Sequence, residues 1–100
     1  MNARKTVVLV LMKGHEEADA TVDVLRRNNP EIKIKDQGTY WHLEAEDEIV
    51  VDLESVSKEI GRELSLAQWL VIMSSYVGRI HTEPDSFTVT SRLIEIEPET

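Results

Sequence analysis

The hydrophobic positions of this chain predict several strands, of which the first has an unusual pattern. Residues 6–12 form an unbroken apolar run that is rich in β-branched side chains. Such a run is typical of a strand buried on both faces, so we expect it at the centre of a sheet. Alternating apolar and polar positions predict further strands at residues 32–35, 40–45, 48–51, 74–81 and 86–90. Short turns join the first three of these, which we therefore expect to form a β-meander.

Apolar residues at helical spacing predict helices between these strands. The first helix spans residues 15–28, and the second spans residues 53–60, with Asp52 as its N-cap and Gly61 just beyond its last turn. The resulting order is β-α-β-β-β-α-α-β-β. We therefore expect the α+β class, as a single domain with a largely antiparallel sheet packed against helices.

A third helix is predicted to begin at Ser65, which forms a capping box with Gln68. Its expected apolar face consists of Leu66, Trp69, Leu70 and Met73. Two serines, Ser74 and Ser75, follow this apolar block directly. Because buried hydroxyl groups need hydrogen-bond partners, either these serines bond to nearby backbone or they lie on a surface made for another molecule. Spacing alone favours the first alternative.

The boundaries of the domain follow from the same pattern. We expect a short N-terminal tail at residues 1–5, the domain at residues 6–96, and a frayed acidic C-terminus at residues 97–100. Leu93, Ile94 and Ile96 either extend the last strand or pack over the core. Gly78 lies inside the predicted strand 74–81, where a glycine indicates a bulge or a close backbone approach.

Composition narrows the possible partners. The chain has 100 residues, a net charge of −8 and no cysteine. The negative charge disfavours nucleic acid and anionic membranes as partners, because both are negatively charged and bind positively charged protein surfaces. Without cysteine there is no disulfide, thiolate nucleophile or iron–sulfur ligand. No signal peptide or membrane-spanning run is evident, so we expect a cytoplasmic protein.

The residues that usually carry catalysis are scattered. None of His15, His42 and His81 has a second histidine three or four positions away, so we expect no metal site. There is no phosphate-binding glycine motif, and Ser74 and Ser75 lack a nucleophile elbow. Most carboxylates fall on faces expected to be solvated. We therefore expect no catalytic or cofactor-binding residues, which favours a protein that acts by binding another protein.

Several fragments, taken in order, resemble one protein family. They are Thr-Val-Val-Leu-Val-Leu from residue 6, Asn-Pro at 29, Asp-Gln-Gly-Thr-Tyr-Trp from 36, residues 49–52, Ile-Gly-Arg from 60, Trp-Leu-Val-Ile-Met-Ser-Ser-Tyr-Val-Gly-Arg from 69, and Phe-Thr-Val-Thr-Ser from 87. The chain is similar to the MmoB/DmpM family, the effector or coupling proteins of soluble di-iron monooxygenases. The Ser-Ser and Tyr-Trp pairs resemble the methane, short-alkane and alkene types more than the phenol and toluene types.

The resemblance implies a cofactor-free regulatory protein that is not an enzyme. Its implied partner is the di-iron hydroxylase component, on which it docks to tune active-site access, oxygen activation and coupling. The positions that the resemblance assigns to docking are Ile72, Ser74, Ser75 and Tyr76. Arg79 is a further candidate for docking, with a structural ion pair or backbone contact as the alternative. Trp69 and Arg62 are either structural or docking residues, and the core is the favoured place for Trp69. Tyr76 is larger than the small residue often found at its position in relatives, and Ile72 is apolar where some relatives have a polar residue. These two departures limit what the resemblance implies about control of substrate access.

Methane-type members of the family also carry a long N-terminal arm that contributes to hydroxylase binding. Only five residues precede the first predicted strand here. We expect either binding by the domain face alone or a shortened chain. Two other hypotheses stay open, namely a stand-alone small-molecule-binding or sensor domain and a small enzyme with a carboxylate site.

Overall fold

The computed structural model describes residues 5–91 of the chain. Its elements, in order, are β1 (Thr6–Met12), α1 (Glu16–Asn28), β2 (Lys33–Asp36), β3 (Tyr40–Glu46), β4 (Glu48–Asp52), α2 (Leu53–Ile60), α3 (Leu66–Leu70), β5 (Met73–Val77), β6 (Arg79–Glu83) and β7 (Ser86–Thr90). The predicted α+β class is confirmed, and the predicted order holds as far as α3. The predicted strand 74–81 is wrong, because it is two strands, β5 and β6, separated by Gly78. The expectations for residues 1–4 and 92–100, including Leu93, Ile94 and Ile96, lie outside the described residues.

The strands form two antiparallel sheets rather than one. Sheet A has the order β2-β3-β1-β5, and sheet B has the order β4-β7-β6. The predicted meander is confirmed for β2 and β3, which pair, but is wrong for β4, which leaves β3 and pairs with β7. Asp47, between β3 and β4, has a φ of 76°, and its carbonyl accepts a hydrogen bond from Ser91. This turn carries the chain from one sheet to the other.

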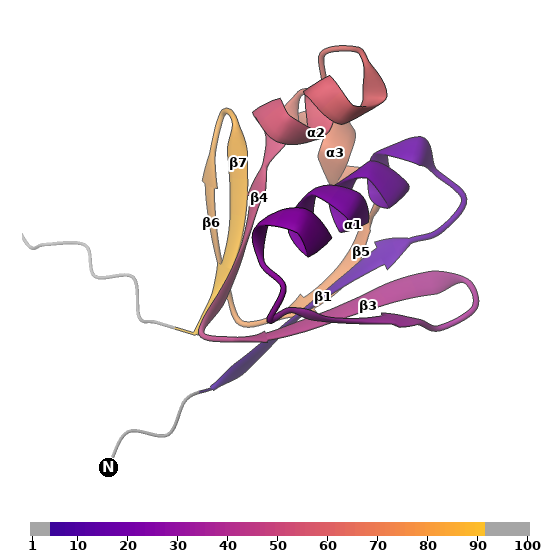
Figure 1. The fold of residues 1–100 in the computed structure, drawn as a ribbon. Helices are drawn as coiled ribbons and strands as arrows, with labels where there is room; N and C mark the ends of the chain where they lie inside the picture. Colours follow the sequence, from indigo (N-terminus) through magenta and orange to yellow (C-terminus); the bar gives the residue numbers. More distant parts are fainter. Residues whose placement is uncertain (1–4, 92–100) are drawn as a thin grey trace, which may run out of the picture.

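The helices lie on one side of sheet A, as Figure 1 shows. The two longer helices begin and end as their sequences predict. The Asp52 side chain accepts a hydrogen bond from the amide of Glu54, and Gly61 adopts the left-handed conformation after α2. The capping box of Ser65 and Gln68 is present, but α3 ends at Leu70, which is exposed. The predicted apolar face of this helix is therefore wrong at Leu70.

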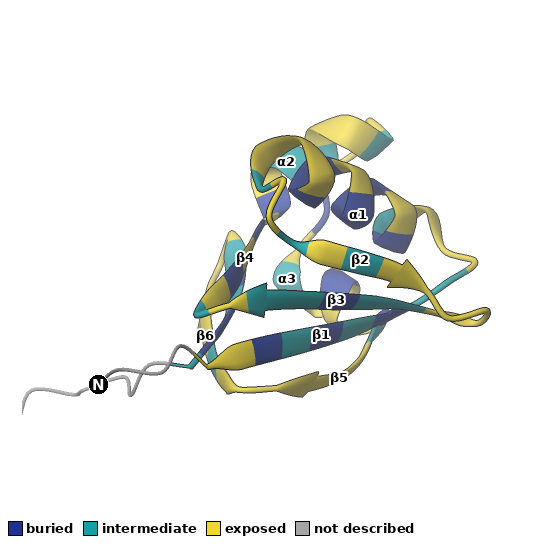
Figure 2. Cartoon of the chain, turned by 60° about the horizontal axis from the view of Figure 1, so that its bottom comes forward, coloured by how far each residue is buried: buried dark blue, intermediate teal, exposed yellow. Residues whose placement is uncertain are grey.

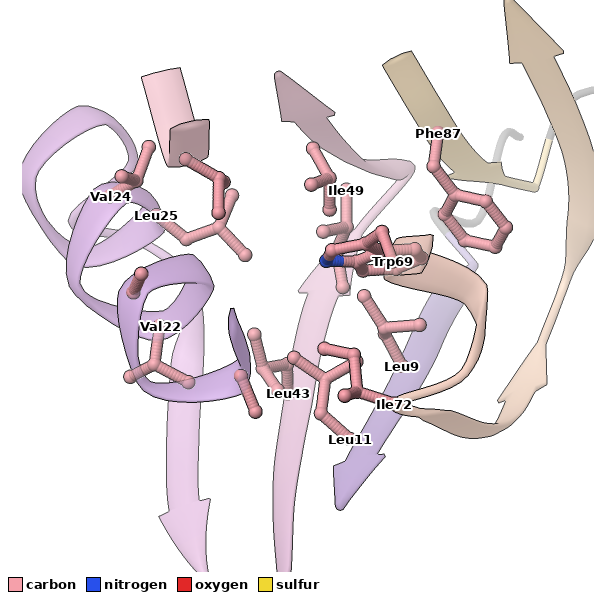
Figure 3. Packing of buried hydrophobic residues seen from close by; sticks show 14 of the residues in the cluster. Leu9, Leu11, Val22, Val24, Leu25, Leu43, Ile49, Trp69, Ile72 and Phe87 are labelled. Atoms are coloured by element: carbon pink, nitrogen blue, oxygen red, sulfur yellow. The ribbon is translucent and has the colours of Figure 1, made fainter. Parts of the chain in front are cut away.

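The core fills the space between the helices and the two sheets. Trp69 is fully buried near its centre, and its ring centroid lies 4.7 Å from that of Phe87 on β7 (Figure 3). The indole Nε1–H of Trp69 donates a hydrogen bond of 3.0 Å to Oγ1 of Thr21 on α1. One side chain thus ties α3 to α1 and to sheet B.

Strand β1 is central in sheet A, as predicted, between β3 and β5. Its burial, however, is one-sided. Val7, Leu9 and Leu11 are fully buried against the helices, whereas Val8, Val10 and Met12 are only half-buried and Thr6 is exposed. The prediction that both faces of this strand are buried is wrong for the described part of the chain. Figure 2 shows this second face in front of the helices.

Candidate functional site

Strand β5 lies at the edge of sheet A. It pairs with β1 on one side only. Four of its five residues are exposed, including Tyr76 at 44% and Val77 at 59%. The two residues before β5 differ sharply, because Val71 is 69% exposed and Ile72 is 2% exposed. Ile72 therefore anchors the start of an otherwise exposed strand to the core.

A β-bulge at Ser74 determines which side chains of β5 share a face. Val10 on β1 lies opposite Ser75, and Leu11 lies opposite Met73, so Ser74 is the extra residue. Residues directly opposite one another in an antiparallel pair project to the same side. Ser75 consequently lies on the side of Val10, away from the helices. The bulge also interrupts the exposed edge, which protects an edge strand from indiscriminate pairing.

The two serines do not use their hydroxyl groups within the described structure. No side-chain hydrogen bond joins Ser74 or Ser75 to another residue in the range 5–91, and both residues are exposed. The favoured sequence interpretation, in which these hydroxyls bond to nearby backbone, is therefore wrong. The alternative, that they lie on an open surface, agrees with the structure.

The other predicted docking residues are not all on this surface. Tyr76 lies opposite Leu9 and so projects to the helix side of sheet A, at its margin. Ile72 is buried, so its assignment to a docking surface is corrected to a role in the core. Trp69 is fully buried, which confirms the core interpretation of this residue. Arg79 is exposed but lies on β6, beyond Gly78, and thus on sheet B.

Arg62 has a structural role. Its guanidinium Nη2 lies 2.9 Å from Oε2 of Glu16 and 2.8 Å from Oε2 of Glu17, both in the first turn of α1. The hydrogen bond from Arg62 lowers the pKa of Glu17 below its ordinary value of 4.5. These contacts link the loop after α2 to α1, which is the structural alternative expected for Arg62.

Other parts of the surface offer little chemistry. An open groove of about 380 Å³ lies beside the ends of β2 and β3, and it is lined mainly by polar residues: Thr6, Asn29, Glu31, Ile32, Lys33, Glu44, Ala45, Glu46, Asp47 and Glu48. Within residues 5–91, no group of three or more histidine or carboxylate side chains is placed to hold a metal ion. No helix in the described part of the chain is long and apolar enough to cross a membrane.

Sequence reasoning missed part of the exposed surface. Val71 and Val77 flank the predicted docking residues, and both are more exposed than Tyr76. The available signal was the alternation within residues 73–77, which places Val77 two positions after Ser75. That signal could not be used without knowing that this segment is an edge strand.

The fold has clear counterparts among solved structures. The structure of the soluble methane monooxygenase regulatory protein B matches with a TM-score of 0.69 and 33% identity, covering 93% of this chain and 70% of that one. A regulatory protein in a phenol hydroxylase complex matches with a TM-score of 0.77 over 86% of this chain and 98% of that one. Its identity of 19% shows the fold alone.

The sequence is similar to two methane monooxygenase regulatory proteins B. The protein from Methylococcus capsulatus is 35% identical over 97 residues, which is 92% of this chain and 69% of the relative. The protein from Methylosinus trichosporium is 33% identical over 96 residues, which is 91% of this chain and 69% of the relative. The model of the MmoB/DmpM family matches residues 5–90, almost the whole of the described structure. The chain belongs to the MmoB/DmpM family.

Proposed function

We propose that this protein is the regulatory component of a soluble multicomponent monooxygenase and acts by docking on the di-iron hydroxylase component. The observation that carries the proposal is the open edge strand β5, on which Ser74 and Ser75 have hydroxyls without partners in residues 5–91. The relatives at 33–35% identity are named as regulatory proteins of methane monooxygenase. A non-catalytic component of such a system must present a surface to a partner, and β5 is suited to that role.

The small side chains of β5 support close approach to the partner. A serine hydroxyl adds little bulk and can donate or accept a hydrogen bond. Tyr76 follows the serines on the same edge strand; its side chain projects to the helix side of sheet A but is 44% exposed, and aromatic residues often dominate interface energies. Together, Ser74, Ser75 and Tyr76 form the docking residues that we retain from the sequence prediction, and Arg79 is their neighbour across Gly78.

A regulatory protein without its own catalytic group can change a reaction only through differential binding. It stabilises the hydroxylase conformation to which it binds more tightly, and each tenfold shift requires about 1.4 kcal/mol of differential binding energy. We infer that docking in this way changes substrate access, oxygen activation and the coupling of electrons to product. The di-iron centre belongs to the hydroxylase, and this chain supplies no cofactor. By linkage, the hydroxylase conformation must in turn change the affinity for this protein.

The direct test is product formation by the cognate hydroxylase and reductase, titrated with this protein. We expect turnover and coupling to rise and then to saturate near one regulatory protein per active site. Unchanged turnover at every ratio, together with no detectable complex, would contradict the proposal and favour the sensor-domain hypothesis.

A single substitution tests the docking strand. Ser75→Arg places a large cation on an exposed position, so we expect the fold to persist while stimulation of the hydroxylase is lost. Val50→Arg is the matched control, because Val50 is 40% exposed on a strand of sheet B. Circular dichroism verifies the fold of both variants. Normal stimulation by Ser75→Arg would show that docking does not use β5.

A further inference from the structure

The edges of the two sheets differ in how they are protected from other strands. An unprotected edge strand offers its outer backbone N–H and C=O groups to any strand that approaches it. On sheet A, β2 carries the exposed Lys33 and Lys35, and β5 has the bulge at Ser74. On sheet B, β4 lies close to β1 and β3 of sheet A. Lysines, bulges and covering elements all hinder pairing between sheet edges.

The remaining edge, strand β6, lacks these protections. Among the described strands it pairs with β7 alone, in unbroken register from Arg79 opposite Thr90 to Glu83 opposite Ser86. Four of its five residues are exposed, and its sequence contains no lysine or proline. Figure 1 shows β6 at the outer margin of sheet B, with no described element beyond it. This strand therefore presents a regular edge on which another strand can pair.

The two ends of β6 carry opposite charges. Ile80 packs against the core, so Arg79, His81 and Glu83 project to the outward face of sheet B. Arg79 makes no ion pair within residues 5–91. The Glu83 carboxylate lies 3.4 Å from Nε2 of His81, and its side chain is 60% exposed. The strand thus begins with a cation that has no counter-ion in the described structure and ends with an accessible carboxylate.

This charge pattern is complementary to itself in an antiparallel pair. When two β6 strands pair about His81, Arg79 of each copy lies opposite Glu83 of the other, and Ile80 lies opposite Thr82. Opposite charges directly across a pair of strands are favourable, whereas like charges are unfavourable. A parallel pair in register would place the two arginines together and the two glutamates together. The charges on β6 therefore favour a second copy of this chain in the antiparallel direction.

We propose that β6 is a self-association surface, on which two copies of this chain pair antiparallel and join their sheets B into one continuous sheet. The strand order of that sheet is β4-β7-β6-β6-β7-β4. The arrangement has two-fold symmetry, so the contact between Arg79 and Glu83 occurs twice. This inference goes beyond the proposed function, because it involves no hydroxylase.

The size of the surface predicts a weak dimer. A strand of five residues offers a strip about 17 Å long and about 5 Å wide, on the order of 100 Å². A stable protein interface buries about 800 Å² on each partner. The net charge of −8 on each copy also opposes association. We therefore expect a dissociation constant between about 0.1 and 1 mM.

The test measures the monomer–dimer equilibrium of the purified protein by sedimentation equilibrium. Concentrations bracket the expected dissociation constant, at an ionic strength of about 0.15 M, where charges more than about 8 Å apart are largely screened. Arg79→Glu and Glu83→Arg each place like charges opposite one another. Each should weaken the dimer at least about tenfold. Arg26→Glu is the control, because it makes the same charge change as Arg79→Glu at an exposed position on α1, and it should stay within about threefold of wild type.

Combining the two substitutions gives the sharpest discrimination. Arg79→Glu has a carboxylate at both ends of β6, and Glu83→Arg has a guanidinium at both ends. An equimolar mixture of the two variants should therefore form a heterodimer at least as tight as the wild-type dimer, although each variant alone is monomeric. The double variant Arg79→Glu/Glu83→Arg keeps the net charge of −8 and should regain the wild-type dissociation constant. Circular dichroism verifies the fold of every variant.

Four results would overturn the inference. The first is a wild-type protein that stays monomeric up to about 2 mM, above the expected dissociation constant. The second is a dimer that Arg79→Glu leaves unchanged, which would place the contact on another surface. The third is loss of the dimer without recovery in the mixture, because net charge would then explain the loss. The fourth is a monomeric wild type in which Glu83→Arg weakens binding to the hydroxylase, which would assign β6 to that partner. None of the first three results bears on the proposed function.

Discussion

At the scale of single residues, Gly78 shows how one position joins the two sheets. It separates β5 from β6 and has a φ of 138°, a value that side chains other than glycine rarely adopt. A Cβ atom there would lie 2.9 Å from Cγ1 of Val89 and 3.1 Å from the carbonyl oxygen of Thr90. The glycine therefore allows sheet A to continue directly into sheet B at close range. The predicted close backbone approach at this position is confirmed.

The consequence can be tested by adding a methyl group. Gly78→Ala should lower the free energy of unfolding by about 3 kcal/mol, through both backbone strain and overpacking. Gly38→Ala is the control, because Gly38 also has a positive φ of 87° but no atom within 4 Å of the added Cβ. It should cost about 1 kcal/mol, from the backbone alone. Equal losses in urea denaturation would show that close packing at Gly78 does not matter.

At the scale of elements, α1 and α2 are joined through arginines. Arg27 on α1 bonds to Glu59 on α2 at 2.9 Å, and Arg62 after α2 bonds back to Glu16 and Glu17. One arginine thus reaches from α1 to α2, and the other reaches from the end of α2 to α1. The arrangement positions α2 and the following segment, which leads through α3 to β5, the proposed docking strand.

Protonation should release one of these links. Glu17 has a lowered pKa in the folded protein because Arg62 bonds to its carboxylate, so this contact stabilises the fold at pH values above 4.5 and is lost as the pH falls below that value. Arg62→Met should therefore be less stable than wild type near pH 7, and this deficit should shrink near pH 3. Urea denaturation of both proteins at the two pH values measures it. A deficit that stays constant with pH would contradict the ionic origin of the contact.

At the scale of the whole molecule, two sheets share one core. Trp69 contacts Phe87 of sheet B and Thr21 of α1, while Leu9 and Leu43 of sheet A lie in the same cluster (Figure 3). No boundary separates the described residues into two independent cores. Small domains with a single core generally unfold in one cooperative step.

The two tryptophans offer probes of this cooperativity. Trp41 lies on sheet A and donates a hydrogen bond to Asp19, whereas Trp69 lies at the centre of the core. In Trp69→Phe only Trp41 reports by fluorescence, and in Trp41→Phe only Trp69 reports. For each variant, the fluorescence midpoint should coincide with that of circular dichroism in thermal unfolding. Separate midpoints would show that sheet A and the core unfold independently.

The sequence by itself determined most of the elements, their order and the family. Helix caps at Asp52, Gly61 and Ser65 and the apolar periods are local, because they depend on residues a few positions apart. The same local pattern identified Trp69 as a core residue. It also located the exposed serines in the right segment, although it favoured the wrong environment for them.

Only the tertiary structure decided which strands pair and which faces stay open. An alternating strand does not specify its partner, so β4 was predicted in the wrong sheet. For the same reason, residues 74–81 were predicted as one strand, although the chain passes from sheet A to sheet B at Gly78. The same limit applies to burial, because Ile72 and Val71 are both apolar neighbours yet differ in exposure from 2% to 69%. Burial depends on contacts between residues far apart in the chain, which local spacing does not contain. The apolar run of β1 was plain in the sequence, but its open face could be seen only after folding.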